Sequence, residues 1–241
     1  MTIEQPLDQP VDRSPAQGAM TAPAIEAPGR PPSRTRTVLV GGGLLISALA
    51  VAGLLLWLPW GERNDFGYDS IAPIRDTAWL GIALDGFAFG LLAITASLAT
   101  CMLAPARGRR WAEVGAVVTI VGGLAFAMGA FARGAVSWFA SDPALGADTG
   151  RTLLALIEGE PGRLLLVAMA GFLLVTVGML VLAVAWWRSR SVPRWLPIAL
   201  AALTVAQFTV FEGRALDVLQ ILVMLVLAAF AIAFLRRRPV G

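Results

Sequence analysis

The chain has 241 residues, of which 57% are hydrophobic and 15% are charged, with a formal net charge of +3. It contains no histidine and no lysine, which excludes imidazole ligation of a metal or haem and a lysine Schiff base. The single cysteine, Cys101, excludes an internal disulfide and sites of the CxxC type. We therefore expect no cofactor and no bound metal.

Residues 1–36 are rich in proline and poor in apolar periodicity. They contain seven of the 15 prolines, together with four acidic residues and four arginines. Such a segment cannot bury enough apolar surface to offset the entropy lost on ordering. We predict a disordered, Pro-rich cytoplasmic tail, which serves either as a plain spacer or as a docking segment for a partner.

Apolar runs of membrane-spanning length follow the tail. They lie at about 38–60, 79–104, 112–135, 163–187, 195–212 and 215–235. A helix needs about 20 apolar residues to cross a hydrocarbon core about 30 Å thick, and lipid leaves no partner for unpaired backbone groups. The prediction is an all-α, polytopic transmembrane helical bundle with six helices, spanning residues 37–238.

Arginine placement predicts the orientation of this bundle. Thirteen of the 19 basic residues lie in the tail, in "PARGRRW", in "WRSRSVPR" and at the C-terminal "FLRRRPVG", whereas the other connections mix arginine with an excess of acids. By the positive-inside rule, both termini are cytoplasmic. All eight tryptophans lie at or near a predicted helix end, which is typical of aromatic belts at the two headgroup levels.

Polar residues gather toward the predicted outer ends of the helices. Asp85 lies six residues inside Trp79, or about 9 Å below the outer interface. The candidate ligand-binding residues at this level are Asp85, Arg133, Gln207, Glu212, Asp217 and Gln220. Two interpretations stay open: a structural cluster in which Asp85 pairs with Arg133, or a shallow, outward-facing site for a polar or cationic ligand.

Small residues form a stripe along the segment 79–104. Gly86 and Gly90 make a GxxxG pattern, which Ala93, Ser97 and Cys101 continue at helical spacing. We call these five residues the small-residue stripe. Such a stripe lets two membrane helices approach closely. It therefore predicts a packing face, and it is one candidate surface for a membrane-protein partner.

Two predicted outer loops carry further features. Asp65 and Asp69 have a DxxxD spacing that could hold a hard cation such as calcium, but nothing else in the loop matches a cation-binding pattern, which favours a solvated acidic loop. Leu153, Leu154 and Ile157 have helical spacing before Gly159, which predicts a short helix on the membrane surface. That helix is either a connector or a lid over the outer polar cluster.

Two segments carry a resemblance to known proteins. "WWRSRSVPRWLPIAL" lies between the fourth and fifth predicted helices, and "RRWAEVGAVVTIVGG" opens the third. On these segments the chain, over about residues 38–236, resembles bacterial six-helix membrane proteins that are grouped as domains of unknown function. The resemblance implies a bacterial source and location in the cytoplasmic membrane, and it implies no catalytic residue. The use of arginine in place of lysine suggests a GC-rich genome, such as that of an actinobacterium.

The motif search favours a protein without catalytic machinery. No Walker motif, HExxH or GxSxG is present, and the arginines sit beside helix ends rather than in a basic groove for nucleic acid. We predict a membrane scaffold or accessory component whose partners are the lipid bilayer and a membrane protein that binds the small-residue stripe or the tail. The alternative is a small transporter or ligand sensor built around Asp85, and a membrane enzyme ranks third.

Overall fold

The computed structural model describes residues 33–61, 67–104, 108–190, 192–210 and 214–236. Within these ranges the chain consists of helices and turns. The elements are α1 (Arg34–Trp57), α2 (Tyr68–Ile71), the 3₁₀ helix η1 (Ala72–Ile74), α3 (Arg75–Leu103), α4 (Arg109–Ala140), the 3₁₀ helix η2 (Pro143–Leu145), α5 (Ala147–Gly159), α6 (Pro161–Ser189), α7 (Trp195–Ala206) and α8 (Arg214–Leu235).

The described helices are those of a membrane-embedded protein. Five of them are long and apolar enough to cross a bilayer: α1, α3 together with the short helices before it, α4, α6 and α8. The sixth apolar helix of the described chain, α7, has only 12 residues and is about 18 Å long. The helix predicted over 195–212 is therefore shorter than expected, because the backbone leaves the helix after Ala206.

Helix α1 begins earlier than predicted. Its first residue is Arg34 rather than residue 38, because Ser33 caps it: the Arg36 amide donates to Ser33 Oγ at 3.3 Å. Residues 34–36, which the sequence places in the tail, are thus helical. The remainder of the predicted tail, residues 1–32, lies outside the described residues.

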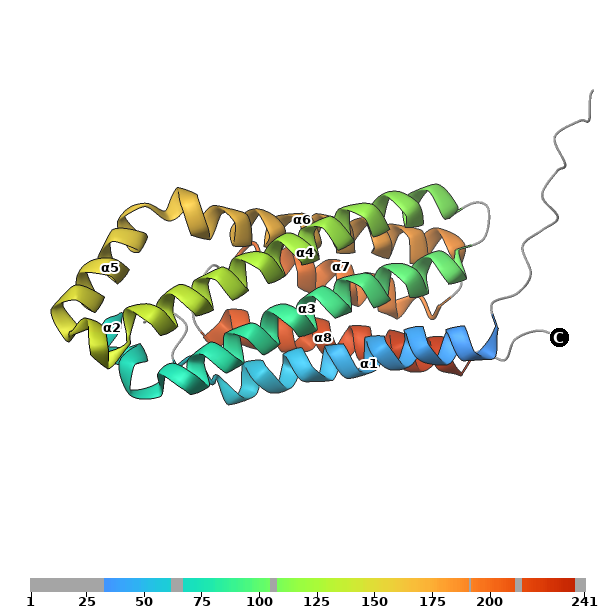
Figure 1. Ribbon diagram of the computed structural model, residues 1–241. Coiled ribbons are helices and arrows are strands. Elements are labelled where there is room, and N and C mark those ends of the chain that lie inside the picture. Colours follow the sequence, from blue (N-terminus) through green and yellow to red (C-terminus); the bar gives the residue numbers. More distant parts are fainter. Residues whose placement is uncertain (1–32, 62–66, 105–107, 191, 211–213, 237–241) are drawn as a thin grey trace, which may run out of the picture. The chain divides into compact units, whose positions relative to one another are not determined.

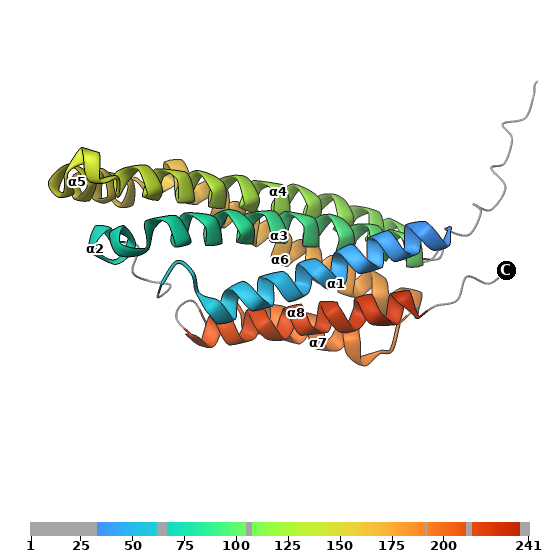
Figure 2. The same cartoon turned by 60° about the horizontal axis from the view of Figure 1, so that its bottom comes forward.

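The six apolar helices of the described chain pack in a ring. Each contacts its neighbours in the order α1, α3, α4, α6, α7, α8, and α8 returns to α1. Figure 1 and Figure 2 show α3, α4 and α6 side by side, with α1 against α8 and α7 between α6 and α8. The core therefore lies inside this ring, where α3, α6, α7 and α8 face one another.

The small-residue stripe of α3 packs on α4 of the same chain. A Cβ added at Gly86 would lie 3.2 Å from the Ala127 carbonyl oxygen, and Ala93 faces Gly123. Farther along, Ser97 Oγ donates to the Ala116 carbonyl oxygen at 3.4 Å. The stripe thus stabilises a helix pair inside this chain, as close backbone approach through small residues allows.

The core also contains two tryptophans that the sequence assigned to the aromatic belts. Trp186 is 1% exposed, stacks on Phe230 at 3.9 Å between ring centroids, and donates to Thr100 Oγ1 at 2.8 Å. Trp60 is 6% exposed and packs at Gly81. The belt prediction was wrong for these two, because sequence position alone does not show which side of a helix faces lipid.

The end of the bundle remote from Arg34 carries a folded cap made of α2, η1, η2 and α5. Arg151 joins α5 to α2 through an ion pair with Asp69 at 2.7 Å. Arg75 contacts the Asp142 carboxylate at 3.1 Å, and its guanidinium carbon lies 4.3 Å from the centre of the Trp138 ring. We call this region the cap, and the opposite end of the bundle the terminal end.

Candidate functional site

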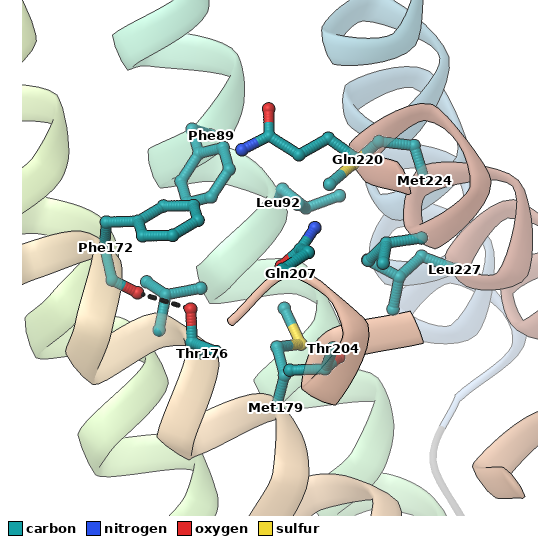
Figure 3. Close-up of a pocket in the computed structure, with 12 residues that line it drawn as sticks. Phe89, Leu92, Phe172, Thr176, Met179, Thr204, Gln207, Gln220, Met224 and Leu227 are labelled. Carbon is teal, nitrogen blue, oxygen red and sulfur yellow. Dashed lines mark hydrogen bonds between the residues drawn. The ribbon is translucent and has the colours of Figure 1, made fainter. Parts of the chain in front are cut away.

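A small cavity lies inside the helix ring, between α3, α6, α7 and α8 (Figure 3). Its volume is about 30 Å³. It is lined by Phe89, Leu92, Phe172, Val175, Thr176, Met179, Thr204, Gln207, Gln220, Val223, Met224 and Leu227. A single water needs roughly 10–15 Å³ of such space, so the cavity has room for about two water molecules or a small ion.

The polar groups of the cavity come from three helices. Thr204 on α7 is 2% exposed, and its hydroxyl oxygen is buried without a hydrogen-bond partner. Gln220 on α8 is 7% exposed, and Figure 3 shows its amide and that of Gln207 reaching into the same space. Thr176 on α6 donates to the Phe172 carbonyl at 2.8 Å, so its oxygen lone pairs remain as acceptors.

The cavity sits where α7 ends. The backbone N–H of Gln207 still donates to the Leu203 carbonyl, four residues back, at 3.1 Å. The backbone N–H groups of Phe208 and Thr209 donate instead to carbonyls three residues back, those of Val205 and Ala206, each at 3.0 Å. The local sequence "TVAQFTV" is rich in β-branched residues, which lose rotamer freedom in a helix. Because Gln207, the residue after α7, lines the cavity, the partial negative charge of the helix C-terminus lies beside it.

The cavity lies deeper in the bundle than the shallow site that the sequence predicts at the outer interface. Phe89 and Leu92 lie near the middle of α3, and the α6 lining residues, Phe172 to Met179, lie near the middle of Pro161–Ser189. The cavity is thus about 20 Å from either end of these helices. This is the mid-level of the bundle, where an unsatisfied polar group is most costly.

The structure brings together two of the six candidate residues, Gln207 and Gln220, around the cavity. Asp217 is buried, at 3% exposure, one turn before Gln220 on the same face of α8, but it is not a lining residue. Asp85 is half-buried one turn before Phe89 on α3, and Arg133 is half-buried on α4. Glu212 lies outside the described residues.

Asp85 and Arg133 share a level of the α3–α4 interface. Their neighbours in sequence are in contact there, since Gly86 packs on Ala130 and Gly134 packs on Ile82. Both side chains have interaction partners in the structure. The ion pair between them stays a prediction.

The α6 contribution was missed by sequence reasoning. Thr176 and Met179 carry no pattern of their own, because a single hydroxyl in an apolar run usually bonds its own helix, as Thr176 does. The sequence does, however, contain a pattern that indicates how α6, and with it Thr176 and Met179, packs on α4. Gly115, Gly122 and Gly129 repeat every seven residues on α4, and Gly171 and Gly178 do so on α6.

The acidic loop does not present a free pair of carboxylates. Asp69 is engaged by Arg151, and Asp65 lies outside the described residues. The Arg151 hydrogen bond holds the pKa of the Asp69 carboxyl below its ordinary value. At the other side of the cap, the Ala144 amide, followed by Arg75, lowers the pKa of Asp142. These charges stabilise the cap.

Comparison with known proteins adds no relative: no family model, no curated protein and no solved structure matches this chain.

Proposed function

We propose that this membrane protein binds a monovalent cation in the cavity at the end of α7 and works as a small cation sensor or transporter of a bacterial cytoplasmic membrane. In this proposal α7 and the turn after it form a sixth crossing, and both termini are cytoplasmic. The observation that carries the proposal is the buried, unpartnered hydroxyl of Thr204 beside two glutamine amides in a cavity at mid-bundle.

The energetics favour an occupied site. A buried polar group without a hydrogen bond destabilises a protein by about 1–3 kcal/mol. Thr204 is 2% exposed and its hydroxyl oxygen has no hydrogen-bond partner, whereas valine would fill the same space without this cost. A bound ion or water between the α6, α7 and α8 lining residues satisfies this hydroxyl, and about 30 Å³ accommodates it.

The donor set favours a cation. Thr204, Thr176, Gln207 and Gln220 offer hydroxyl and amide oxygens, and no lysine or arginine lines the cavity. The C-terminus of α7 adds partial negative charge, as the ends of discontinuous helices do in ion-coupled transporters. Oxygen dipoles of this kind replace the hydration shell of an alkali cation.

The test is the melting temperature of the purified protein in NaCl, KCl and choline chloride at equal ionic strength. A ligand at 100 times its Kd stabilises the folded state by about 2.7 kcal/mol, so we expect a rise of several degrees in Na⁺ or K⁺ over choline. Thr204→Val removes one oxygen at nearly constant shape and should abolish the rise. The matched control is Thr95→Val, because Thr95 is buried on α3, bonds only its own helix at Leu91 and Leu92, and does not line the cavity.

The proposal is wrong if the three salts give equal melting temperatures, or if Thr204→Val responds to cations as the parent does. An increase in stability of Thr204→Val in every salt would identify the cavity as an unfilled packing defect.

A scaffold or accessory role is the second candidate, and the cap favours it. The cap is a folded surface at one end of the bundle, held in part by the Arg151–Asp69 and Arg75–Asp142 pairs, and it leaves Leu156 63% exposed. A partner that copurifies in stoichiometric amount and is lost with Leu156→Glu or on deletion of residues 1–32 would support this role.

A further inference from the structure

A second, larger hollow lies between α6 and α7 on the side of the terminal end. Its volume is about 640 Å³, and it is open along its length. Leu180, Ala183, Val184 and Trp187 of α6 and Pro197, Ile198, Ala201, Ala202 and Val205 of α7 line it. We call it the α6–α7 groove. All of its lining residues are apolar, and no polar group competes for water there.

The groove exists because small residues line the facing sides of the two helices and leave space between them. Ala183 on α6 and Ala201 and Ala202 on α7 leave space that larger side chains would fill, while Val184, Ile198 and Val205 stand at its rim with 40–53% exposure. Along α7 the groove extends from Pro197 to Val205, or about 12 Å. An extended hydrocarbon chain fits a furrow of this kind, which lies parallel to the membrane-spanning helices.

One end of the groove meets a cluster of arginines. α6 ends at Ser189, and Arg190 then adopts a left-handed conformation (φ 49°) that turns the chain toward α7. Arg188 lies in the last turn of α6, Arg190 directly follows the helix, and Arg194 directly precedes α7, and all three residues are exposed. No acidic residue occurs between Trp187 and Trp195.

Arg194 connects this arginine cluster with the groove through a contact with one of the groove-lining residues. Its guanidinium carbon lies 6.0 Å from the centre of the Trp187 ring, and Trp187 is a groove-lining residue, 51% exposed. Trp195, 55% exposed, stands at the start of α7. Exposed indole rings prefer the headgroup level of a bilayer, which places the mouth of the groove among lipid headgroups.

We propose that the α6–α7 groove binds one anionic phospholipid, with an acyl chain between α6 and α7 and the phosphate against Arg188, Arg190 and Arg194. The apolar side chains of the lining match the acyl chain, and the three arginines at the turn between α6 and α7, where the sequence has no acidic residue, match the negative headgroup. Guanidinium groups bind phosphate oxygens in a bidentate manner, and basic sites between membrane helices select anionic headgroups. This site is separate from the cavity and does not depend on its ligand.

The experiment is native mass spectrometry of the detergent-purified chain, titrated with dioleoylphosphatidylglycerol or with dioleoylphosphatidylcholine, which has the same acyl chains. We expect one phosphatidylglycerol to bind at least tenfold more tightly than phosphatidylcholine. The triple variant Arg188→Gln/Arg190→Gln/Arg194→Gln should lose that preference. The control triple variant Arg34→Gln/Arg36→Gln/Arg110→Gln removes the same charge from other helices at the terminal end and should change the affinity less than threefold.

A second variant tests the acyl chain independently of charge. Ala202→Phe fills the groove from its exposed side and should weaken phosphatidylglycerol binding at least tenfold with every arginine present. A photocrosslinking amino acid at position 198 then reacts with whatever occupies the groove in intact membranes, and we expect an adduct with a lipid.

Four results would overturn the proposal. Equal binding of the two lipids, or equal losses in the two triple variants, would show nonspecific charge attraction. Full binding by Ala202→Phe would show a headgroup contact without the groove. A protein adduct at position 198 would show that a partner helix, rather than a lipid, fills it.

Discussion

At the scale of single residues, glycine decides how closely α4 and α6 approach. A Cβ added at Gly122 would lie 2.6 Å from the Val175 backbone nitrogen and 2.8 Å from the Gly171 carbonyl oxygen. Gly178 faces Thr119 in the same way, and Thr119 is fully buried. Since the obstructing atoms belong to the backbone, no rotamer change relieves such a clash. This contact fixes α6, which carries Thr176 and Met179 to the cavity.

Gly122→Ala should therefore destabilise the protein, whereas Gly42→Ala should not. Overpacking a close interface costs about 1–3 kcal/mol. Gly42 on α1 has no atom within 4 Å of an added Cβ, and alanine favours a helix over glycine. Thermal unfolding in detergent compares the two identical substitutions. Equal melting temperatures would show that α4 and α6 are not in the close contact described.

The residue scale also shows where sequence reasoning stops. The shared face of Asp217, Gln220 and Met224 follows from helical spacing, and all three are buried. The meeting of Gln220 with Thr176 and Gln207 does not follow, because it depends on which helices are neighbours in the ring. For Trp186 the sequence is misleading. Its position at a helix end predicts contact with lipid headgroups, but its packing on Phe230 puts it in the core.

At the scale of elements, the cap combines ion pairs with a few buried apolar side chains, among them Ile71 of α2, which is 1% exposed. Leu154 is the buried apolar residue of α5, at 7% exposure, and Gly150 approaches Tyr68 and the Ala140 carbonyl. The Arg151–Asp69 pair joins the two surface helices, α5 and α2. α5 begins at Ala147, ahead of the predicted helical residues Leu153, Leu154 and Ile157, because Gly146 takes the positive φ of 74° that opens it.

Acid should loosen the cap. The pKa values of Asp69 and Asp142 are lowered in the folded protein, so their contribution to stability is present above the unfolded value of about 3.9. It is lost as the pH falls through the folded values. Amide hydrogen exchange, corrected for intrinsic rates, should show α2 and α5 losing protection as the pH falls below about 4, with the middle of α3 unchanged.

Asp69→Asn provides the matched variant for the cap. It should show weaker protection of α5 at neutral pH and a smaller further change on acidification, because one of the two titrating pairs is already absent. Full protection of α5 at pH 3 in the parent would contradict the role given to these carboxylates.

The short α7 marks the limit of element prediction from hydropathy. The run 195–212 is mostly apolar, so its composition predicts one helix, yet the helix ends at Ala206. Hydropathy measures affinity for lipid and not the path of the backbone. The β-branched and aromatic residues after Ala206 were the available sequence signal for this early end. The rest of the explanation is the closure of the helix ring around Gln207, which the sequence does not show.

At the scale of the whole molecule, the order of helices in the ring explains why the cavity forms. α7 is the shortest apolar helix of the described chain and lies between two long ones, α6 and α8. Its early end leaves a gap at mid-bundle that the side chains of Gln207 and Gln220 enter. The apolar helices and most of their bounds were predictable from composition and length. Their neighbours were not, because lipid-facing and protein-facing residues are equally apolar.

The proposed topology has six crossings with both termini inside. Reporter fusions at residues 70, 108, 145, 191 and 213 and at the C-terminus should alternate outside, inside, outside, inside, outside, inside. A reporter at 213 that is active on the same side as one at 191 would show that α7 enters and leaves from the inner face. The sixth crossing would then be withdrawn, together with the inside placement of one terminus.

The most direct test of the central claim is a structure determined with rubidium or thallium ions, whose anomalous scattering identifies a monovalent cation. We expect one anomalous peak in the cavity, within coordination distance of Thr204 Oγ1 and of an amide oxygen of Gln207 or Gln220, and no such peak in Thr204→Val. A well-ordered cavity without an anomalous peak, whether empty or filled by water alone, would contradict the claim that this protein binds a cation there.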